Sequence, residues 1–296
     1  MASDLSIRPA RAGDRDAMER ICAHTFEWGD YVPEVWDDWL GDEEGLLSVG
    51  EVAGRIVALS KVTFLTPSQT WLGGMRVDPE YRRRGIAGAF LTHDLSFSRE
   101  RGARVARLAT GDHNVAVHTN ASRAGMERVG SYMLWTAEAQ PTRTPPLILS
   151  PDHAVQIQDF LLTSPVLAHC HGLYSSGWAW QELSGERIRH FLNSGQVSAL
   201  VAPGGGLAAL AVLDTEPDRE RTWVCFADGE PSAVAALASA ARVYASQAGV
   251  KQVSAMLPDV AWLREAFRAA GYGLGDWEGE LWIFERRLDG DGDDAS

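Results

Sequence analysis

The sequence has few cysteines, a deficit of basic residues and no long apolar run. Its 296 residues include 3 cysteines, and 27 Lys and Arg stand against 40 Asp and Glu, which gives a formal net charge of −13. An odd number of widely spaced cysteines does not form a disulfide framework, and the first residues lack a basic segment followed by an apolar one. These absences favour a reduced, cytoplasmic protein.

The same deficits exclude two kinds of partner. Affinity for phosphate backbones and anionic lipids rests on clustered Lys and Arg, so an acidic chain is a poor general binder of either. The longest apolar stretch, Leu207–Leu213, is far shorter than the ~20 residues of a membrane-spanning helix. We predict no nucleic-acid partner and no membrane contact, and leave a homodimer open.

What the sequence does contain is a regular order of strands and helices. Its apolar fraction of 45% is that of a globular protein, and its length suggests two domains of ~100–200 residues each. The fold class we expect is α/β (α+β), a mixed central sheet with flanking helices. Alternating apolar residues, turn glycines and helical spacing predict strands at Leu46–Val52, Ile56–Thr63, Thr70–Val77 and Arg104–Thr110, and helices at Ile86–Arg101 and Val115–Ala124.

The second half repeats this order of elements more loosely. The segment that runs from N-V-A to R-A-G-M at 114–126 is echoed by the segment that runs from D-V-A to R-A-A-G-Y at 259–272. Internal self-similarity of this kind indicates a duplicated unit.

The most informative segment, residues 75–88, reads MRVDPEYRRRGIAG. It places a strand end, a turn and a helix start together, and the first amides of a helix carry partial positive charge without intrahelical partners. Gly85, Ala87 and Gly88 keep side chains away from these amides, and Arg82–Arg84 add three positive charges, so the segment favours an anion site. The alternative is a turn glycine beside solvated arginines. The patterns G-x-x-x-x-G-K-S/T and G-x-G-x-x-G are absent here.

These residues resemble the signature of the GNAT N-acetyltransferases. The pattern R-x-x-G-x-A at 82–87 matches Q/R-x-x-G-x-G/A, and the strand before it is similar to that family's usual lead-in. Asn114 stands eleven residues before Gly125, which is similar to the N-x10-GF spacing of the next helix, with Met126 in place of Phe. The resemblance implies an acyl-CoA N-acyltransferase-like fold, which we expect to be duplicated.

The resemblance also implies where acetyl-CoA binds. The co-substrate would lie where strands Thr70–Val77 and Arg104–Thr110 part, with its pantetheine arm paired to one strand and the Met75 amide stabilising the oxyanion. Backbone amides of the arginine-glycine loop would hold the pyrophosphate. The cofactor-binding residues implied are Met75, Arg76, Val77, Arg82, Arg83, Arg84, Gly85, Ile86, Ala87, Gly88 and Asn114.

The groups that move protons are less well defined. The tyrosine that many members carry four residues before the G of GF is Ala121 here. His118 shares a predicted helix face with Asn114, so it is a catalytic candidate, with packing as the alternative. Asp30, Tyr31 and Glu34, from the acid-rich segment between the first helices, are candidates for the base, with a solvated acidic turn as the alternative.

A narrower resemblance concerns the acceptor. The run Asp30-Tyr31-Val32-Pro33, followed by Trp39, is similar to the start of vertebrate histidine N-acetyltransferase-like proteins, which suggests an amino-acid-like amine. His169-Cys170-His171 has no second pair of ligands at metal-binding spacing, so we predict no metal.

The domains we expect are a GNAT N-acetyltransferase domain with the acetyl-CoA site at 1–139, a linker at 140–150, a degenerate GNAT-like domain without phosphate loop at 151–288, and an acidic disordered tail at 289–296. The predicted function is acetyl-CoA-dependent acetylation of a small or amino-acid-like primary amine, by direct attack in a ternary complex. Two alternatives stay open: an acyl-CoA-binding sensor with little or no turnover, and a structural protein that binds another anion.

Overall fold

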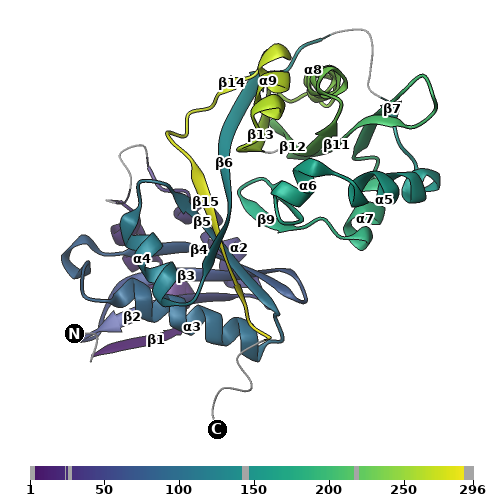
Figure 1. Cartoon of the computed structure of the whole chain (residues 1–296). Helices are drawn as coiled ribbons and strands as arrows, with labels where there is room; N and C mark the ends of the chain where they lie inside the picture. Colours follow the sequence, from purple (N-terminus) through teal and green to yellow (C-terminus); the bar gives the residue numbers. More distant parts are fainter. Residues whose placement is uncertain (1–3, 24, 26–28, 142–146, 217–219, 290–296) are drawn as a thin grey trace. The chain divides into compact units, whose positions relative to one another are not determined.

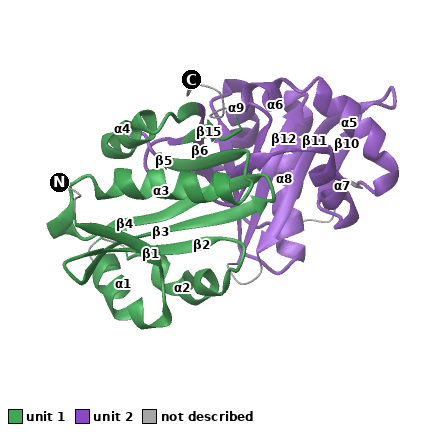
Figure 2. Ribbon diagram, turned by 90° about the horizontal axis from the view of Figure 1, so that it is seen from below, with its two compact units in different colours: residues 1–110, 114–128, 283–296 green, residues 111–113, 129–282 purple. Residues whose placement is uncertain are grey.

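The computed structural model describes residues 4–23, 25, 29–141, 147–216 and 220–289. The chain divides into two compact units (Figures 1 and 2). Unit 1 contains residues 1–110, 114–128 and 283–296, and unit 2 contains residues 111–113 and 129–282.

Unit 1 is a mixed sheet with helices on both faces. Its helices are α1 (Arg15–Cys22), α2 (Val32–Gly41), α3 (Ile86–Glu100) and α4 (Val115–Arg123), with short 3-10 turns at Ala12–Asp14 and Pro79–Tyr81. Each strand from β1 to β4 runs antiparallel to the next, and β5 is parallel to β4. The strand order is β1 (Leu5–Pro9), β2 (Leu46–Val52), β3 (Arg55–Thr66), β4 (Gln69–Val77), β5 (Val105–Gly111) and β15 (Leu281–Arg287).

The two faces of this sheet have separate apolar cores. On one face, Met18 of α1 and Trp36 of α2 pack on Val49 and Leu59, and Trp36 is completely buried. On the other face, α3 covers β3 and β4 (Figure 2), and its Phe90 is completely buried. Burial of such a side chain contributes roughly 1.5–3 kcal/mol, so these cores hold the helices that flank the site.

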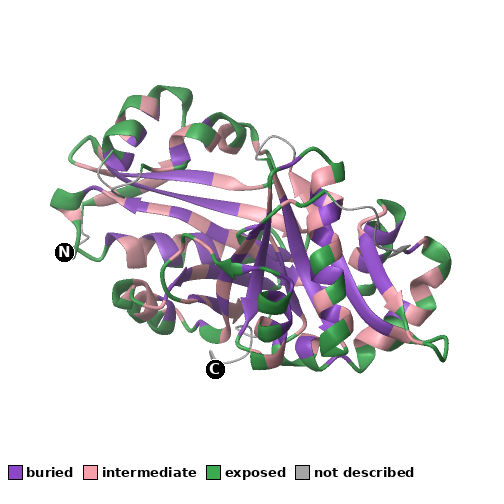
Figure 3. Cartoon of the chain, turned by 90° about the horizontal axis from the view of Figure 1, so that it is seen from above, coloured by how far each residue is buried: buried purple, intermediate pink, exposed green. Residues whose placement is uncertain are grey.

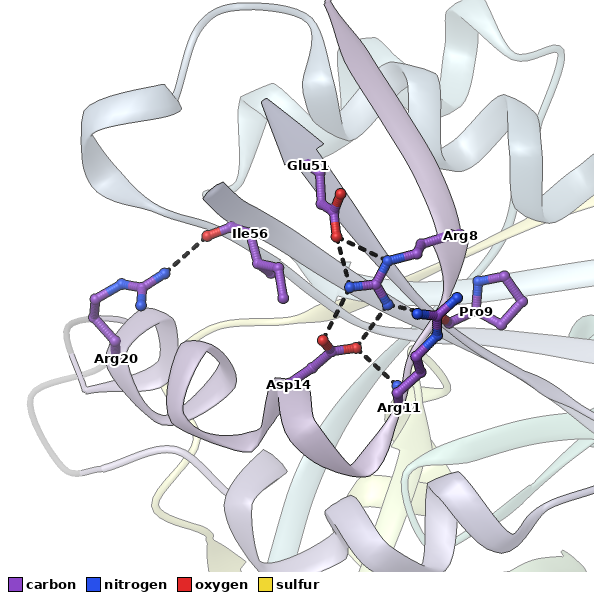
Figure 4. A network of polar contacts seen from close by, with 7 residues as sticks. All are labelled: Arg8, Pro9, Arg11, Asp14, Arg20, Glu51 and Ile56. Carbon is purple, nitrogen blue, oxygen red and sulfur yellow. Dashed lines mark hydrogen bonds and ion pairs between the residues drawn. The ribbon is translucent and has the colours of Figure 1, made fainter. Parts of the chain in front are cut away.

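A charged network fastens the start of the chain to this sheet (Figure 4). The Arg8 guanidinium of β1 donates to both carboxylate oxygens of Asp14, at 2.8 and 2.9 Å, and to Glu51 of β2 at 2.8 Å. The Arg11 amide also donates to Asp14 at 2.8 Å. These hydrogen bonds lower the pKa of Asp14, so its carboxylate stays ionised and orients the entry into α1.

The strands of unit 2 follow the same local plan. Its strand order is β7, β10, β11, β12, β13, β6, with β14 also paired to β6. Its strands are β6 (Glu127–Glu138), β7 (Leu147–Ile148), β10 (Val197–Val201), β11 (Leu207–Glu216), β12 (Arg221–Gly229), β13 (Gln252–Pro258) and β14 (Gly273–Leu274), and β8 (Leu173–Ser176) pairs with β9 (Ala179–Glu182) in a separate hairpin. Its helices are α5 (Ala154–Leu162), α6 (Pro165–His169), α7 (Gly185–Asn193), α8 (Pro231–Gln247) and α9 (Ala261–Ala269), with a 3-10 turn at Pro151–His153.

The two units share one topology, which supports duplication. In each, three antiparallel strands lead through a long helix, α3 or α8, to a strand parallel to the third, followed by a further helix. The middle strands of unit 2 are buried along most of their length (Figure 3). The predicted fold class, a mixed sheet with flanking helices, is confirmed.

Each unit receives a strand from the other half of the chain. After α4 the chain enters unit 2, where β6 pairs antiparallel with β13, and after α9 it returns to unit 1, where β15 lies beside β5. The compact units are therefore not contiguous ranges, unlike the domains proposed at 1–139 and 151–288. Residues 142–146 of the predicted linker and 290–296 of the predicted tail lie outside the described residues.

A buried ion pair ties the returning strand to unit 1. The Arg107 side chain of β5 is 1% exposed, and its Nε donates to Glu285 of β15 at 2.7 Å. Its Nη1 also donates to Gln69 of β4. Arg107 thus joins three neighbouring strands, β4, β5 and β15.

The predicted strands and the helices α3 and α4 are found within a few residues of their predicted bounds. A second helix was expected before the first hairpin without bounds, which is α2, whereas helices α5 and α6 and the β8–β9 hairpin were not predicted. None of the helices in the described part of the chain is long and apolar enough to cross a membrane.

Replacement of Glu285 by alanine should lower the free energy of unfolding by about 3–5 kcal/mol, because it removes the carboxylate from a buried guanidinium. Urea denaturation at neutral pH measures the loss. The control is Lys251→Ala, which breaks an exposed pair with Glu220 and should cost at most about 1 kcal/mol. Equal losses in the two variants would contradict the role given to Arg107.

Candidate active site

The site begins where β4 and β5 separate. The two parallel strands pair only at Gln69–Val105, Thr70–Ala106 and Trp71–Arg107, whereas β4 continues to Val77 and β5 to Gly111. The edge of β4 beyond Trp71 is therefore not paired with β5. An unpaired strand edge beside an opening sheet can accept an extended ligand as an added strand.

A bulge in β4 accompanies this separation. Between Leu59 opposite Arg76 and Lys61 opposite Gly73, β4 has one extra residue, and Gly74 has φ +64°. A Cβ at Gly74 would lie 2.7 Å from the Trp39 ring, so both the backbone conformation and the space require glycine. Bulges bend and twist the strand that carries them, which turns β4 away from β5 just before Met75.

The two sides of β4 beyond the bulge have different neighbours. The half-buried side chains of Met75 and Val77 pack with the core under α3, near Ile86. The Arg76 side chain instead bonds to Asp30, which precedes α2. The backbone of Met75 thus lies between the start of α3 and the residues that precede α2.

The start of α3 has the features of an anion site. Gly85 is the N-cap residue with φ +84°, and no side chain caps the helix. The Ala89 amide already donates to the Gly85 carbonyl at 3.0 Å, so the earlier amides, from Ile86 to Gly88, lie before the first intrahelical bond. Arg83 also has positive φ, +62°, in a loop whose residues 82–85 are exposed.

The three loop arginines have different surroundings. Arg82 Nε donates to the Val77 carbonyl at 3.2 Å, and Arg84 donates to the Glu80 carbonyl at 2.8 Å while it stacks over the Tyr81 ring. Arg83 has no hydrogen bond or ion pair with any described residue. Two arginines therefore shape the loop, and Arg83 is the one whose charge is available to a ligand.

Helix α4 packs beside the start of α3. Asn114 is its N-cap residue, and its side-chain oxygen accepts from the Val117 amide at 3.4 Å, which leaves the amide NH2 group for other contacts. Asn120 lies 3.5 Å from the position of a Cβ at Gly88, so α3 and α4 meet closely there. His118 is half-buried, and its ring lies 5.6 Å from that of Phe284 on β15.

Asp30 and Arg76 form a buried bidentate ion pair. Arg76 Nε donates to Asp30 Oδ2 at 2.6 Å and Nη2 donates to Oδ1 at 3.0 Å, with side-chain exposures of 9% and 2%. The Val32 amide donates to the same carboxylate at 3.1 Å. Hydrogen bonds and charge from Arg76 outweigh burial and lower the pKa of Asp30.

Tyr31 and Glu34 are placed by this ion pair. The Tyr31 ring lies 5.3 Å below the Arg76 guanidinium and packs edge-on against Trp39 at 6.0 Å, yet the residue is 46% exposed. Burial of its hydroxyl raises the pKa of Tyr31, against the opposing effects of Arg76 and the Gly74 amide. Glu34 is exposed in the first turn of α2, where its amide donates to the Tyr31 carbonyl.

The cysteines and possible metal ligands are not arranged for chemistry. Cys22, Cys170 and Cys225 are all buried. Burial raises the pKa of Cys22 to about 12 and that of Cys170 to about 11, and it also raises the pKa of Cys225. Within the described ranges, no group of three or more His, Cys, Asp or Glu side chains could hold a metal ion.

Unit 2 has a corresponding opening that its own chain fills. Strands β12 and β13 pair only from Arg221–Gln252 to Val224–Ala255, and Val166, Cys170 and Leu173 line the small space beyond, about 20 Å³. The buried Asp228 at the end of β12 accepts from the Ser164 hydroxyl and from the Val166 amide. Unit 2 thus has a carboxylate and a filled opening at the positions where unit 1 has a basic loop and a strand edge that is not paired with β5.

Comparison with known proteins defines the class. Residues 16–126 match the model of the Acetyltransferase (GNAT) family. This range contains the β4 bulge, the arginine-glycine loop and α4. This part of the chain therefore matches a GNAT-family domain, as the sequence motif predicted.

Individual relatives extend this result. A 33% identity over 111 residues, 36% of the chain, links it to a histidine N-acetyltransferase from Oreochromis niloticus, and another from Scomber australasicus is 27% identical over the same length. The chain spans about a third of the length of these relatives.

Solved structures with a similar fold cover the whole chain. A GCN5-related N-acetyltransferase from Sphaerobacter thermophilus has a TM-score of 0.64 at 14% identity, over 97% of this chain and 96% of that one. A tandem GNAT protein from the clavulanic acid biosynthesis pathway has a TM-score of 0.55 at 13% identity, over 96% and 98%. At these identities the likeness concerns the fold.

Replacement of Asp30 by asparagine should cost about 3 kcal/mol of unfolding free energy at pH 7, because it leaves the buried Arg76 without this carboxylate. Since the folded pKa of Asp30 is lowered, its contribution is complete above the ordinary Asp value of ~3.9 and is lost as pH falls through the folded pKa. Wild type and variant should therefore converge in acid. Denaturation from pH 7 to pH 3 measures this.

The matched control is Asp37→Asn on α2, whose carboxylate pairs with Arg15 but is 80% exposed. It should change stability by no more than about 1 kcal/mol at any pH. An Asp30→Asn protein as stable as wild type at pH 7 would show that the ion pair does not hold the segment.

Proposed function

We propose that this protein is an acetyl-CoA-dependent N-acetyltransferase that acts on a small or amino-acid-like primary amine. The single observation that carries the proposal is the unpaired edge of β4, which leads from the bulge at Gly74 to an uncapped helix start at Gly85. The matched family model over residues 16–126 supports acetyl transfer as the activity of this domain.

The residues present suit acetyl-CoA. The pantetheine arm would pair with the backbone of β4 from Met75 to Val77, with Asn114 on the opposite side. The pyrophosphate would meet the amides of the loop and of the first turn of α3, Arg83–Gly88, where partial positive charge and the Arg83 guanidinium act together. Arg82 and Arg84 would contribute charge while they hold the shape of the loop.

The reaction is direct attack on the thioester. The neutral amine nitrogen bonds to the acetyl carbonyl carbon, and the Met75 amide stabilises the resulting oxyanion. The carbon–sulfur bond then breaks, and the proton lost by the amine nitrogen is transferred to the departing thiolate, which leaves as the thiol of CoA. An acetyl-cysteine intermediate would need a thiolate, but burial raises the pKa of all three cysteine thiols. This supports transfer within a ternary complex.

The candidates for proton transfer now have different roles. Asp30 is saturated by Arg76 and Val32 and its pKa is lowered, so it is a poor base near neutral pH and acts as a positioning residue. Glu34 and Tyr31 are more exposed and stay proposed acceptor-side groups. His118 stays a proposed acid, packed against Phe284.

The kind of acceptor amine and the number of acetyl-CoA sites can be proposed on similar grounds. The similarity to histidine N-acetyltransferases supports an amino-acid-like amine, over the third of their length that matches. The filled opening in unit 2, with Asp228 at its strand end, supports one acetyl-CoA site per chain. The absence of a metal, the cytoplasmic location, independence of nucleic acid and membranes, and a homodimer stay predictions, as do the linker at 140–150 and the tail at 289–296.

Replacement of Gly85 by valine should weaken acetyl-CoA binding at least tenfold, because a branched side chain crowds the helix start and the left-handed backbone must change. Gly102 ends the same helix with φ +90° and has equally open surroundings, so Gly102→Val is a matched control. Calorimetric titration with acetyl-CoA measures affinity, and thermal denaturation measures stability.

Both variants should lose similar stability through backbone strain, and only Gly85→Val should lose affinity. Equal affinity in the two variants would remove the anion site from this loop. Loss of binding in both would show that strain in α3, and not the site, is responsible.

A further inference from the structure

We propose that unit 2 carries a second binding site, for a small molecule with an apolar body and a single carboxylate. The site is a cavity of about 190 Å³ between α5, α6 and α7. It lies outside the acetyl-CoA site of unit 1, and the proposal does not depend on acetyl transfer. Its lining residues are Ala154, Gln158, Leu161, Leu162, Leu167, Leu183, Gly185, Ile188 and Arg189.

The walls of the cavity select an apolar body. Five of the nine lining side chains are leucine or isoleucine, and the polar side chains are Gln158 and Arg189. An apolar cavity of about 150 Å³ inside a protein is large enough to bind benzene, so this one has room for a phenyl ring or a short alkyl chain. It is smaller than the ~300–1,000 Å³ of pockets for drug-sized ligands.

The rim shows that the cavity is open to a ligand. Leu162 is 78% exposed at the end of α5, although leucine is usually buried, and Ile188 behind it is 3% exposed. The apolar surface therefore continues from solvent into the cavity. An apolar ligand would cover part of the exposed leucine.

The mouth of the cavity selects a negative charge. Arg189 is exposed, and a Cβ built at Gly185 would lie 3.9 Å from its Nη1, which places the guanidinium beside the first residue of α7. No described residue makes an ion pair with Arg189, and no Asp or Glu occurs among the lining residues. A guanidinium is always charged and presents paired donors that fit a carboxylate.

The single cation limits the charge of the ligand. A phosphate ester carries up to two negative charges and usually meets several basic groups, whereas Arg189 is alone at this mouth. The chain as a whole has a net charge of −13, so it supplies little other positive charge. The single guanidinium at this mouth therefore balances the charge of one carboxylate. Gln158 on α5 can donate a further hydrogen bond from the opposite rim.

Binding of hexanoate and phenylacetate to the full chain tests the proposal, with hexylamine and butanoate as comparisons. Calorimetry should give saturable binding of both acids with dissociation constants below about 1 mM. Hexanoate should bind about tenfold more tightly than butanoate, because two more methylenes are buried. Hexylamine should not bind measurably.

Variants separate the cavity from general charge effects. Arg189→Gln should weaken hexanoate binding at least tenfold, because a hydrogen bond to a charged group is lost. The control Arg268→Gln removes an exposed cation of α9 that is paired with Glu265, and should leave affinity unchanged. Ala154→Phe should fill the cavity and abolish binding, with circular dichroism to confirm folding.

Three results would overturn the proposal: no saturable binding of either acid, equal affinity for hexylamine, or an Arg189→Gln protein with wild-type affinity. If Ala154→Phe fails to fold, the comparison of Arg189→Gln with Arg268→Gln still decides.

Discussion

The bulge in β4 is the constraint on which the site in unit 1 depends. No residue with a side chain fits at position 74, because the φ of Gly74 is +64° and the Trp39 ring lies against it. The extra residue turns β4 away from β5 after three paired positions, which leaves the backbone around Met75 paired with β3 on one side and not with β5 on the other. Three features then surround this edge: the uncapped start of α3, the first turn of α4, and the Asp30–Arg76 ion pair that fixes the segment before α2.

A shared topology in the two units explains how one chain builds two versions of this arrangement. Both units contain a parallel pair that separates, β4–β5 and β12–β13. In unit 2 the opening is filled by residues of α6 and β8, and Asp228 occupies the strand end. Because β15 returns to unit 1 and is held there by Arg107, the unit that carries the arginine-glycine loop is completed by β15. The divergence of the two openings therefore accounts for a single proposed acetyl-CoA site.

Local signals could be predicted from the sequence, and distant pairings could not. The strand Leu46–Val52, the helix that begins at Ile86 and the glycine at its N-cap each follow from alternation, spacing or backbone requirement within a few residues. Helix α2 was given no bounds, although its apolar residues Val32, Trp36, Trp39 and Leu40 recur at helical spacing and pack in one core. The bond between Asp30 and Arg76 joins residues 46 apart, and that between Arg107 and Glu285 joins residues 178 apart, so no local pattern indicates either. The exchange of β6 and β15 is likewise a property of the folded chain.

The proposed reaction is the transfer of an acetyl group from acetyl-CoA to an amine at the edge of β4. Its most direct test follows free thiol released from acetyl-CoA by the full chain, with and without histidine and a panel of other amino acids and small amines, and identifies products by mass spectrometry. Release should depend on the added amine and should yield its N-acetyl derivative. Acetyl-CoA binding without amine-dependent release across the panel would instead indicate a sensor, and no binding of acetyl-CoA would contradict the account altogether.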